Sequence, residues 1–320
     1  MSTIAERYRR FARNEAAGRS AVYESLALCV AKSPITLAFL EQLPKERRQP
    51  NLLFAALRLV AGMPVSLEEL DHVIDTNKAT IAEIMRTRST QTNEPGRCAV
   101  LLPAISQIEG PLALIEVGAS AGLCLLPDAY SYDWNGKTLS RPGPSASTRP
   151  VFYCKTCGNT PLPVRYPEIV WRAGLDINPL DVWSDEDVKW LEVLVWPEHD
   201  ERLRHLRKAV RIARMERPRV VPGDLRKDLP ALIAEAPRDA TVVVFHTAVL
   251  SYIAAQGDRD AFAAAMTDNP RVVWLSNESP RTFPQFADTL GSARQNMFLM
   301  AIDGQPKAWT GPHGQEILWI

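Results

Sequence analysis

The residues best suited to chemistry lie in segment 112–126, where an apolar run leads into a turn of small residues. Glu116 comes just before Gly118, and Ala-Ser-Ala separates Gly118 from Gly122. Glycines in such a turn let the backbone approach a ligand that a Cβ atom would exclude, and a helix that begins after the turn offers free amide hydrogens. The segment therefore predicts a strand, a ligand-binding turn around Ser120 and a following helix.

An acid followed by a glycine turn resembles the first motif of S-adenosylmethionine-dependent methyltransferases, with Ser120 in place of the middle glycine. The resemblance implies that Glu116, Gly118, Ser120 and Gly122 bind S-adenosylmethionine as the cofactor. A glycine turn by itself is weak evidence of function, so a purely structural tight turn is the alternative.

The same five residues also match the Gly-x-Ser-x-Gly nucleophile elbow of α/β-hydrolases, which would make Ser120 a nucleophile. In that fold several strands and an oxyanion loop precede the elbow. Here the preceding residues have helical periodicity and contain no His-Gly-Gly motif. The sequence therefore favours the methyltransferase interpretation over a serine hydrolase.

Two aspartates further along the chain follow apolar runs, where ligands bind in open α/β sheets. The methyltransferase resemblance implies that Asp176 accepts hydrogen bonds from the ribose hydroxyls and that Asp224 faces the adenine amino group. Asp176 lies much further past Gly118 than the roughly 20 residues usual for a ribose acid, which makes Asp133 the alternative. For both predicted acids, capping of a helix or turn is an equally good explanation.

Four further residues are candidates for handling the substrate. His246 directly follows the apolar run 241–245, and an imidazole at a strand end could act as the catalytic base near neutral pH. A histidine satisfied by neighbouring backbone is the alternative. Asn93, Glu94 and Arg97 precede the helix that leads into the first strand, so we expect them to fold over the cofactor and contact it or the acceptor; Asn93 could instead only cap that helix.

The elements that must position these residues belong to an α/β fold. Residues 1–93 show helical spacing throughout and predict an all-helical N-terminal region, whereas residues 94–320 predict a Rossmann-like, methyltransferase-type domain. A proline-rich stretch at about 135–168 predicts a surface insertion, for which a β-hairpin is one candidate structure. Seven short apolar runs predict a sheet of seven strands, the last two too close for a crossover and therefore an antiparallel hairpin: 112–117, 169–171, 219–221, 241–245, 271–275, 297–302 and 316–320.

Motifs spread along the chain resemble an uncharacterised bacterial family of unknown function with a methyltransferase-like core. The residues that carry the resemblance are 91–97, 116–123, 174–181, 190–191, 195–198 and 312–314. The resemblance implies a fold and a cofactor class without a known reaction. Two functions therefore stay open: a methyltransferase that acts on a small molecule or other unknown acceptor, and a non-catalytic nucleotide-fold protein whose N-terminal helices close over the site or form a homodimer.

The composition of the chain limits the classes of partner that the protein is expected to bind. Lys plus Arg number 37, as do Asp plus Glu, so the net charge of zero argues against DNA as a ligand. A basic face on the helical segment 201–217 could hold an anion, or could simply be solvated. No apolar run approaches the roughly 18 to 20 residues that span a bilayer, and the first residues do not resemble a signal peptide, so we expect a cytoplasmic protein that does not bind membranes.

The five cysteines are too few and too scattered for a disulfide framework. Cys154 and Cys157 have the spacing of half a zinc ribbon. A second pair is absent and the five histidines show no matching spacing, so we expect no bound metal.

Overall fold

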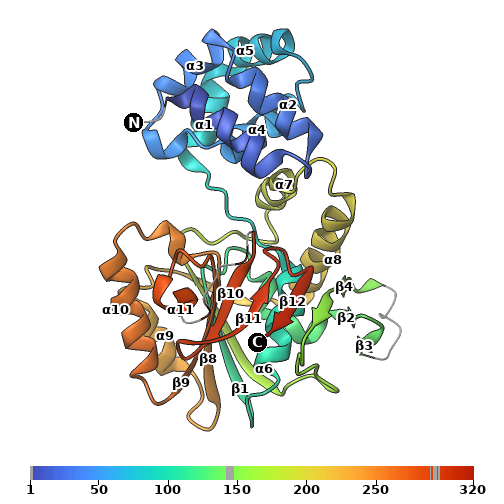
Figure 1. Cartoon of the computed structure of the whole chain (residues 1–320), viewed down its shortest axis with the longest axis vertical. Helices are drawn as coiled ribbons and strands as arrows, with labels where there is room; N and C mark the ends of the chain where they lie inside the picture. Colours follow the sequence, from blue (N-terminus) through green and yellow to red (C-terminus); the bar gives the residue numbers. More distant parts are fainter. Residues whose placement is uncertain (1–2, 142–147, 289, 291–293, 295) are drawn as a thin grey trace. The chain divides into compact units, whose positions relative to one another are not determined.

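The computed structural model describes residues 3–141, 148–288, 290, 294 and 296–320. The chain divides into two compact units, one formed by residues 1–92 with 184–203 and the other by residues 93–183 with 204–320. The described part of the first unit is built of helices, and the second carries the sheets (Figure 1).

The helical unit begins its helices at good N-caps. The side chains of Ser20, Ser33, Ser66 and Ser184 each accept a hydrogen bond from the backbone N–H three residues further on, which satisfies one of the free amides of the first turn. The helices of this unit are α1 (Ile4–Phe11), α2 (Ala21–Val30), α3 (Pro34–Glu41), α4 (Pro50–Val60), α5 (Leu67–Thr87) and α7 (Asp185–Leu194).

Residues from the second half of the sequence complete the core of the helical unit. Trp190 of α7 is fully buried, and its Nε1–H donates to the carbonyl of Ser89 at 2.9 Å. The Trp196 ring packs against Tyr23, with the ring centroids 5.2 Å apart. The N-terminal helices therefore form one core with residues 184–203, which periodicity along the chain does not reveal.

The larger unit contains a nine-stranded sheet with the order β5-β12-β11-β10-β9-β8-β1-β6-β7. Its five strands from β9 to β7 run parallel, and β10, β11 and β12 pair antiparallel in sequence order. The strands are β1 (Leu112–Val117), β5 (Lys155–Cys157), β6 (Ile169–Asp176), β7 (Arg219–Pro222), β8 (Thr241–Thr247), β9 (Val272–Glu278), β10 (Phe298–Ile302), β11 (Gln305–Thr310) and β12 (Glu316–Trp319).

The prediction of a seven-stranded sheet that ends in a hairpin was wrong in two respects. The segment between the last two apolar runs contains β11, so β10 and β12 both pair with β11 and not with each other. Pro306 and Lys307 interrupt the apolar pattern of β11 and concealed it. β5 pairs in parallel with β12 and forms the edge of the sheet, although it lies in the predicted surface insertion.

Two other strands of that insertion, β3 and β4, do not form a simple hairpin but join β2, which precedes the insertion, in a small sheet. Its strand order is β3-β2-β4, with β2 antiparallel to β3 and parallel to β4. Trp134 of β2 is buried, and its Nε1–H donates to the carbonyl of Ala99 at 2.9 Å. The strands are β2 (Ser131–Trp134), β3 (Lys137–Leu139) and β4 (Val151–Tyr153).

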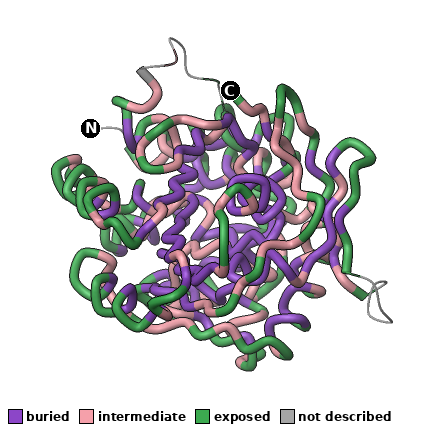
Figure 2. Tube along the Cα trace, turned by 90° about the horizontal axis from the view of Figure 1, so that it is seen from below, coloured by how far each residue is buried: buried purple, intermediate pink, exposed green. Residues whose placement is uncertain are grey.

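The two faces of β1 have different surroundings. Ala113, Ile115 and Val117 join the apolar core formed with α9 (Leu229–Glu235) and α10 (Gln256–Thr267), which lie beside β8 and β9 in Figure 1. Because side chains alternate along a strand, Leu114 and Glu116 point to the opposite face. Figure 2 shows buried residues gathered toward the inside of the trace and exposed residues mainly along its periphery.

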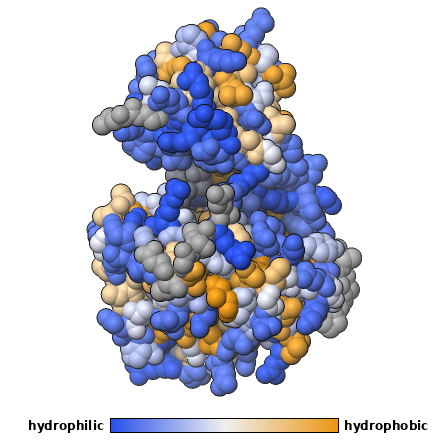
Figure 3. Space-filling model, viewed as in Figure 1, coloured by the Kyte–Doolittle hydropathy of each residue, from blue (hydrophilic) through white to orange (hydrophobic). Residues whose placement is uncertain are grey.

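The helices of the described residues include none that is long and apolar enough by itself to cross a membrane; α2 and α3 pass that test only when taken together as a bent pair. On the face drawn in Figure 3, hydrophilic residues predominate and apolar residues form scattered patches.

Candidate functional site

The candidate site lies where the order of the parallel strands reverses. From β1 the chain continues to β6 and β7 on one side, and then to β8 and β9 on the other. Ligands of open α/β sheets bind at the carboxyl ends of the strands at such a reversal. The predicted residues Glu116, Gly118, Ser120, Gly122 and Asp176 all lie at this edge.

The glycine turn after β1 needs its glycines for conformation. Gly118, Ser120 and Gly122 have φ values of 72°, 51° and 72°, in the left-handed region that side chains disfavour. The N–H of Gly118 donates to the carbonyl of Leu175 at 2.7 Å, so the turn is held against the end of β6. Ser120 adopts this conformation without being a glycine, which is uncommon.

Protein side chains occupy the space beside both glycines. A Cβ atom on Gly118 would lie 2.3 Å from a methyl group of Val249, and one on Gly122 would lie 2.9 Å from a methyl group of Val220. The close backbone approach predicted for a ligand is therefore made by the protein itself at these two positions.

The predicted helix after the turn does not form. Residues Leu123–Leu125 and Pro127–Ala129 make two short 3₁₀ turns. Pro127 explains this, because a proline lacks the N–H that the carbonyl of Leu123 would need and disfavours helical backbone in the residue before it. Side chains satisfy three successive carbonyls of the segment instead.

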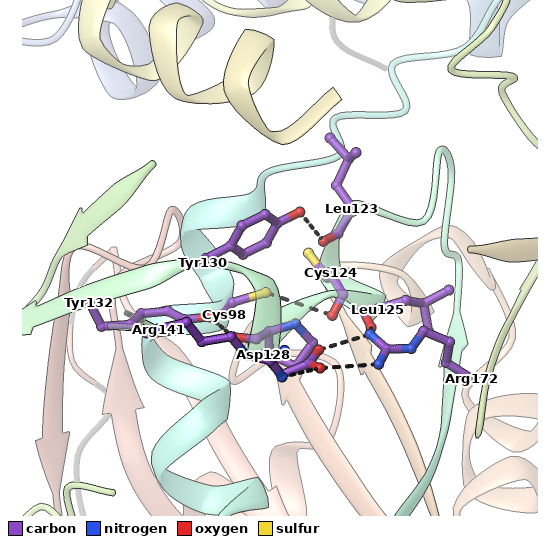
Figure 4. Close-up of polar contacts among 10 residues, drawn as sticks. Cys98, Leu123, Cys124, Leu125, Asp128, Tyr130, Tyr132, Arg141 and Arg172 are labelled. Carbon is purple, nitrogen blue, oxygen red and sulfur yellow. Dashed lines mark hydrogen bonds and ion pairs between the residues drawn. The ribbon is translucent and has the colours of Figure 1, made fainter. Parts of the chain in front are cut away.

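Figure 4 shows these side-chain contacts. The hydroxyl of Tyr130 donates to the Leu123 carbonyl at 2.7 Å, and Arg172 Nη1 donates to the Leu125 carbonyl at 2.9 Å. The thiol of Cys98 lies 3.7 Å from the carbonyl oxygen of Cys124. Arg172 also pairs with Asp128 at 2.8 Å, which fixes the end of the segment.

Asp176 is the last residue of β6, as the sequence predicted. Its Oδ2 accepts the N–H of Ser120 and its Oδ1 accepts the N–H of Asn178, both at 2.8 Å. The carboxylate therefore joins the glycine turn to the segment after β6. The N–H of Leu180 donates in turn to the carbonyl of Ser120 at 3.1 Å.

Glu116 is almost completely buried, with 2% of its surface exposed, and its Oε2 has no hydrogen-bond partner among the described residues. Burial raises the pKa of this carboxyl well above its usual range, and the neighbouring Cys124 raises that pKa further, while Arg97 opposes the shift. A buried acid without a full set of partners is a common feature of ligand sites.

The segment before α6 (Cys98–Ile105) folds against the glycine turn. Oδ1 of Asn93 accepts the N–H of Leu123 at 2.8 Å, so Asn93 caps the segment after the turn rather than α6. The carbonyl of Glu94 accepts from the Cys124 thiol at 3.3 Å. Arg97 donates to the carbonyls of Thr247 and Pro312. All three predicted substrate residues thus lie at the candidate site.

The other two acids that the sequence analysis named as cofactor ligands, Asp224 and Asp133, are held in local turns. Asp224 follows β7, and its Oδ2 pairs with Arg226 Nη2 at 2.6 Å. Hydrogen bonding to Arg226 lowers the pKa of Asp224 to about 2. Asp133, the alternative ribose acid, lies in β2 of the small sheet, where Oδ1 accepts the N–H of Gly136 at 2.6 Å.

His246 lies on the opposite face of the sheet from Glu116. It aligns with Val242 and Val244 of the apolar core, its ring is fully buried, and both ring nitrogens are engaged. Trp274 Nε1–H donates to Nε2 at 3.0 Å, and Nδ1 lies 2.8 Å from Glu278 Oε1. The donation to Nε2 requires a neutral ring with its proton on Nδ1. The structure thus gives His246 a core position and not the access that a catalytic base needs.

Sequence reasoning missed Glu278. This carboxylate is 2% exposed, and its Oε1 also accepts the backbone N–H groups of Val249 and Leu250, at 2.8 and 3.1 Å. Glu278 therefore fixes the loop that places Val249 beside Gly118. Its position as the last residue of β9 was the available signal.

Among the described residues, no three His, Cys, Asp or Glu side chains form a group that could hold a metal ion. Cys154 is buried and Cys157 is exposed, and both are free thiols. Burial raises the pKa of Cys154 to about 12, which disfavours the thiolate that a metal would bind.

Comparison with protein families gives one match. The model of the family DUF2332, described as an uncharacterized protein conserved in bacteria, matches residues 5–319. The chain belongs to this family. The match includes residues of both compact units. Searches of curated proteins and of solved structures gave no significant match.

Proposed function

We propose that this protein is an S-adenosylmethionine-dependent methyltransferase that acts on a small molecule or other acceptor not yet identified. The observation that carries the proposal is the position of Asp176, which ends β6 beside the turn that ends β1, where the strand order reverses. A carboxylate at this position is suited to accept hydrogen bonds from the two hydroxyls of a ribose.

The acids at this edge fit the cofactor. Asp176 would hold the ribose, and the unpartnered Oε2 of Glu116 would receive a donor from the ligand. Asn93 and Glu94 hold the segment that follows the glycine turn, and Arg97 holds the end of β8. When bound, the cofactor supplies an electrophilic methyl group. His246 is given no role as a base in this proposal, because Trp274 and Glu278 engage its ring.

The turn itself favours a second candidate, a non-catalytic binding or interaction protein. Val249 packs against Gly118, and the carboxylate of Asp224 is engaged by Arg226. In this alternative the glycines serve only the tight turn. A serine hydrolase gains less support, because the imidazole of His246 is unavailable to Ser120.

Calorimetric titration with S-adenosylmethionine and its demethylated product separates these candidates. Asp176→Asn keeps a side-chain oxygen for the Ser120 N–H but removes the charge, and we expect it to weaken cofactor binding by roughly tenfold or more. Asp224→Asn is the matched control and should have a smaller effect, since Arg226 already holds that side chain.

The proposal fails if the wild-type protein, shown to be folded by circular dichroism, binds neither form of the cofactor at millimolar concentration. Ser120→Ala should leave cofactor binding largely unchanged. Loss of an esterase activity in that variant would instead support the hydrolase.

A further inference from the structure

A second candidate site lies on the other side of the glycine turn. The larger unit has a pocket of about 310 Å³ between that turn, the segment after β6 and the beginning of β7. Such a volume falls at the lower end of the range of pockets that hold small ligands. Its lining combines polar and apolar groups, and the apolar lining residues are Ala121, Pro179, Leu180, Val182, Pro218 and Val220.

Trp183 and Arg217 bring an aromatic ring and a cation to this pocket. Trp183 is 57% exposed, which is unusual for a large indole ring that has an apolar pocket beside it. The guanidinium carbon of Arg217 lies 5.6 Å from the centre of the Trp183 ring, and that of Arg214 lies 5.9 Å from it. These distances are typical of cation–π pairs.

The backbone holds both residues in place. Arg214 Nε donates to the carbonyl of Val182 at 2.7 Å, which ties the end of α8 (Asp200–Glu216) to the pocket wall. Arg217 follows α8 with a φ of 50°, in the left-handed region that residues other than glycine rarely adopt. In the described part of the chain the Arg217 guanidinium forms no hydrogen bond or ion pair.

Apolar lining residues, an exposed indole and a cation without an acidic partner together define the ligand. We propose that this pocket binds a small planar aromatic anion, with its ring against Trp183 and the apolar lining residues and its carboxylate or phosphate on Arg217. Asp181 also lines the pocket, and its Oδ1 accepts the N–H of Trp183 at 2.8 Å, which holds the Trp183 backbone. The site does not depend on the cofactor proposed above.

The test uses two probes that each join a planar aromatic ring to an anionic group. Guanosine monophosphate is a nucleotide, and 2-naphthoate is an aromatic carboxylate. Their uncharged counterparts, guanosine and 2-naphthol, show whether the anionic group matters. We expect at least one of the two anions to bind in calorimetry, and its uncharged counterpart to bind roughly tenfold more weakly. Binding of the nucleotide alone would identify a nucleotide site, and binding of the naphthoate alone an aromatic carboxylate site.

Arg217→Gln and Trp183→Leu should each weaken binding of the anion by roughly tenfold. Arg219→Gln is the matched control, because Arg219 lies nearby, is exposed and already pairs with Glu235; it should change the affinity by less than about twofold. Glu116→Gln, which lies in the cofactor site, should also leave anion binding unchanged.

Both substituted side chains are exposed, so the variants should fold, and thermal melting checks this. The proposal is overturned if folded wild-type protein binds neither anion at millimolar concentration, or if Arg217→Gln binds them as tightly as wild type does.

Discussion

At the scale of single residues, Glu116 differs most from an ordinary glutamate, whose carboxylate is exposed to solvent or fully hydrogen-bonded. Its carboxyl group is 2% exposed and has an oxygen without a hydrogen-bond partner among the described residues, and burial of this kind favours the neutral form over the ionised one. If the proposed ligand donates a hydrogen bond to this oxygen, its binding should depend on pH, because a bound donor would favour the ionised form that burial disfavours.

The raised pKa of Glu116 predicts how stability depends on pH. Below the ordinary pKa of a glutamate, both folded and unfolded states are protonated. Above it the unfolded state loses its proton first, so the free energy of unfolding falls as pH rises toward the folded pKa, by up to about 1.4 kcal/mol per pH unit. Glu116→Gln removes this titration, and its stability relative to wild type should increase as pH rises from about 5 toward the folded pKa of Glu116.

Urea unfolding of both proteins across this pH range measures the difference. Glu109→Gln, an exposed position in the same unit, is the control and should follow the wild-type profile. A constant difference between Glu116→Gln and wild type at every pH would show that the folded protein does not hold Glu116 neutral.

At the scale of elements, the glycine turn and the loop after β8 form one packed unit. Glu278 holds the backbone of Val249 and Leu250, and Val249 covers Gly118. On the other side Asp176 holds Ser120. The turn is thus fixed by the ends of three neighbouring strands and not by a following helix.

This packing predicts the cost of a methyl group at Gly118. Gly110 also has a positive φ, of 82°, but has open space beside it, so Gly110→Ala should cost only the backbone strain of about 1 to 2 kcal/mol. Gly118→Ala adds a contact of 2.3 Å with Val249 and should cost about 1 to 3 kcal/mol more. Chemical unfolding of the two variants gives this difference directly.

A double-mutant cycle identifies the contact. Val249→Ala removes the two methyl groups nearest to the new Cβ atom, so the double variant should be less destabilised than the sum of the single variants. Equal costs at Gly110 and Gly118 would mean that the loop after β8 moves away from the turn, as ligand binding there would require.

At the scale of the whole molecule, the two compact units have separate cores. Trp190 belongs to the helical unit, and Trp274 to the core between the sheet and α10. Units with independent cores generally unfold in separate steps. The chain is interleaved, however, since the helical unit takes residues 184–203 from between β6 and β7.

We expect calorimetry to show two thermal transitions. Trp190→Ala should lower the midpoint of one of them and Trp274→Ala that of the other, each through a loss of about 3 to 5 kcal/mol of stability. Each variant serves as the control for the other. A single transition that both substitutions lower equally would show that the two units unfold as one.

Sequence patterns anticipated the strands best where they were continuous and apolar. All seven apolar runs contain or overlap a strand, and Glu116 and Asp176 lie at strand ends as predicted. The prediction of a helix after the glycine turn was wrong because Pro127 prevents that helix. This proline is visible in the sequence, but the prediction followed the methyltransferase resemblance instead. β11 was missed because Pro306 and Lys307 interrupt its apolar pattern. β5 was missed because it is a short edge strand with mostly polar residues, which need not be buried on both faces.

By itself the sequence determined the helical character of the first ninety residues, the parallel strands and the position of the glycine turn, because these follow from local periodicity and backbone chemistry. Only the tertiary structure decided which face His246 occupies, what covers Gly118, and which residues complete the helical unit. These depend on contacts between residues far apart in the chain, such as Val249 with Gly118 and Trp190 with Ser89. Periodicity says which side of an element is buried, but the identity of its neighbour is set by how the elements pack.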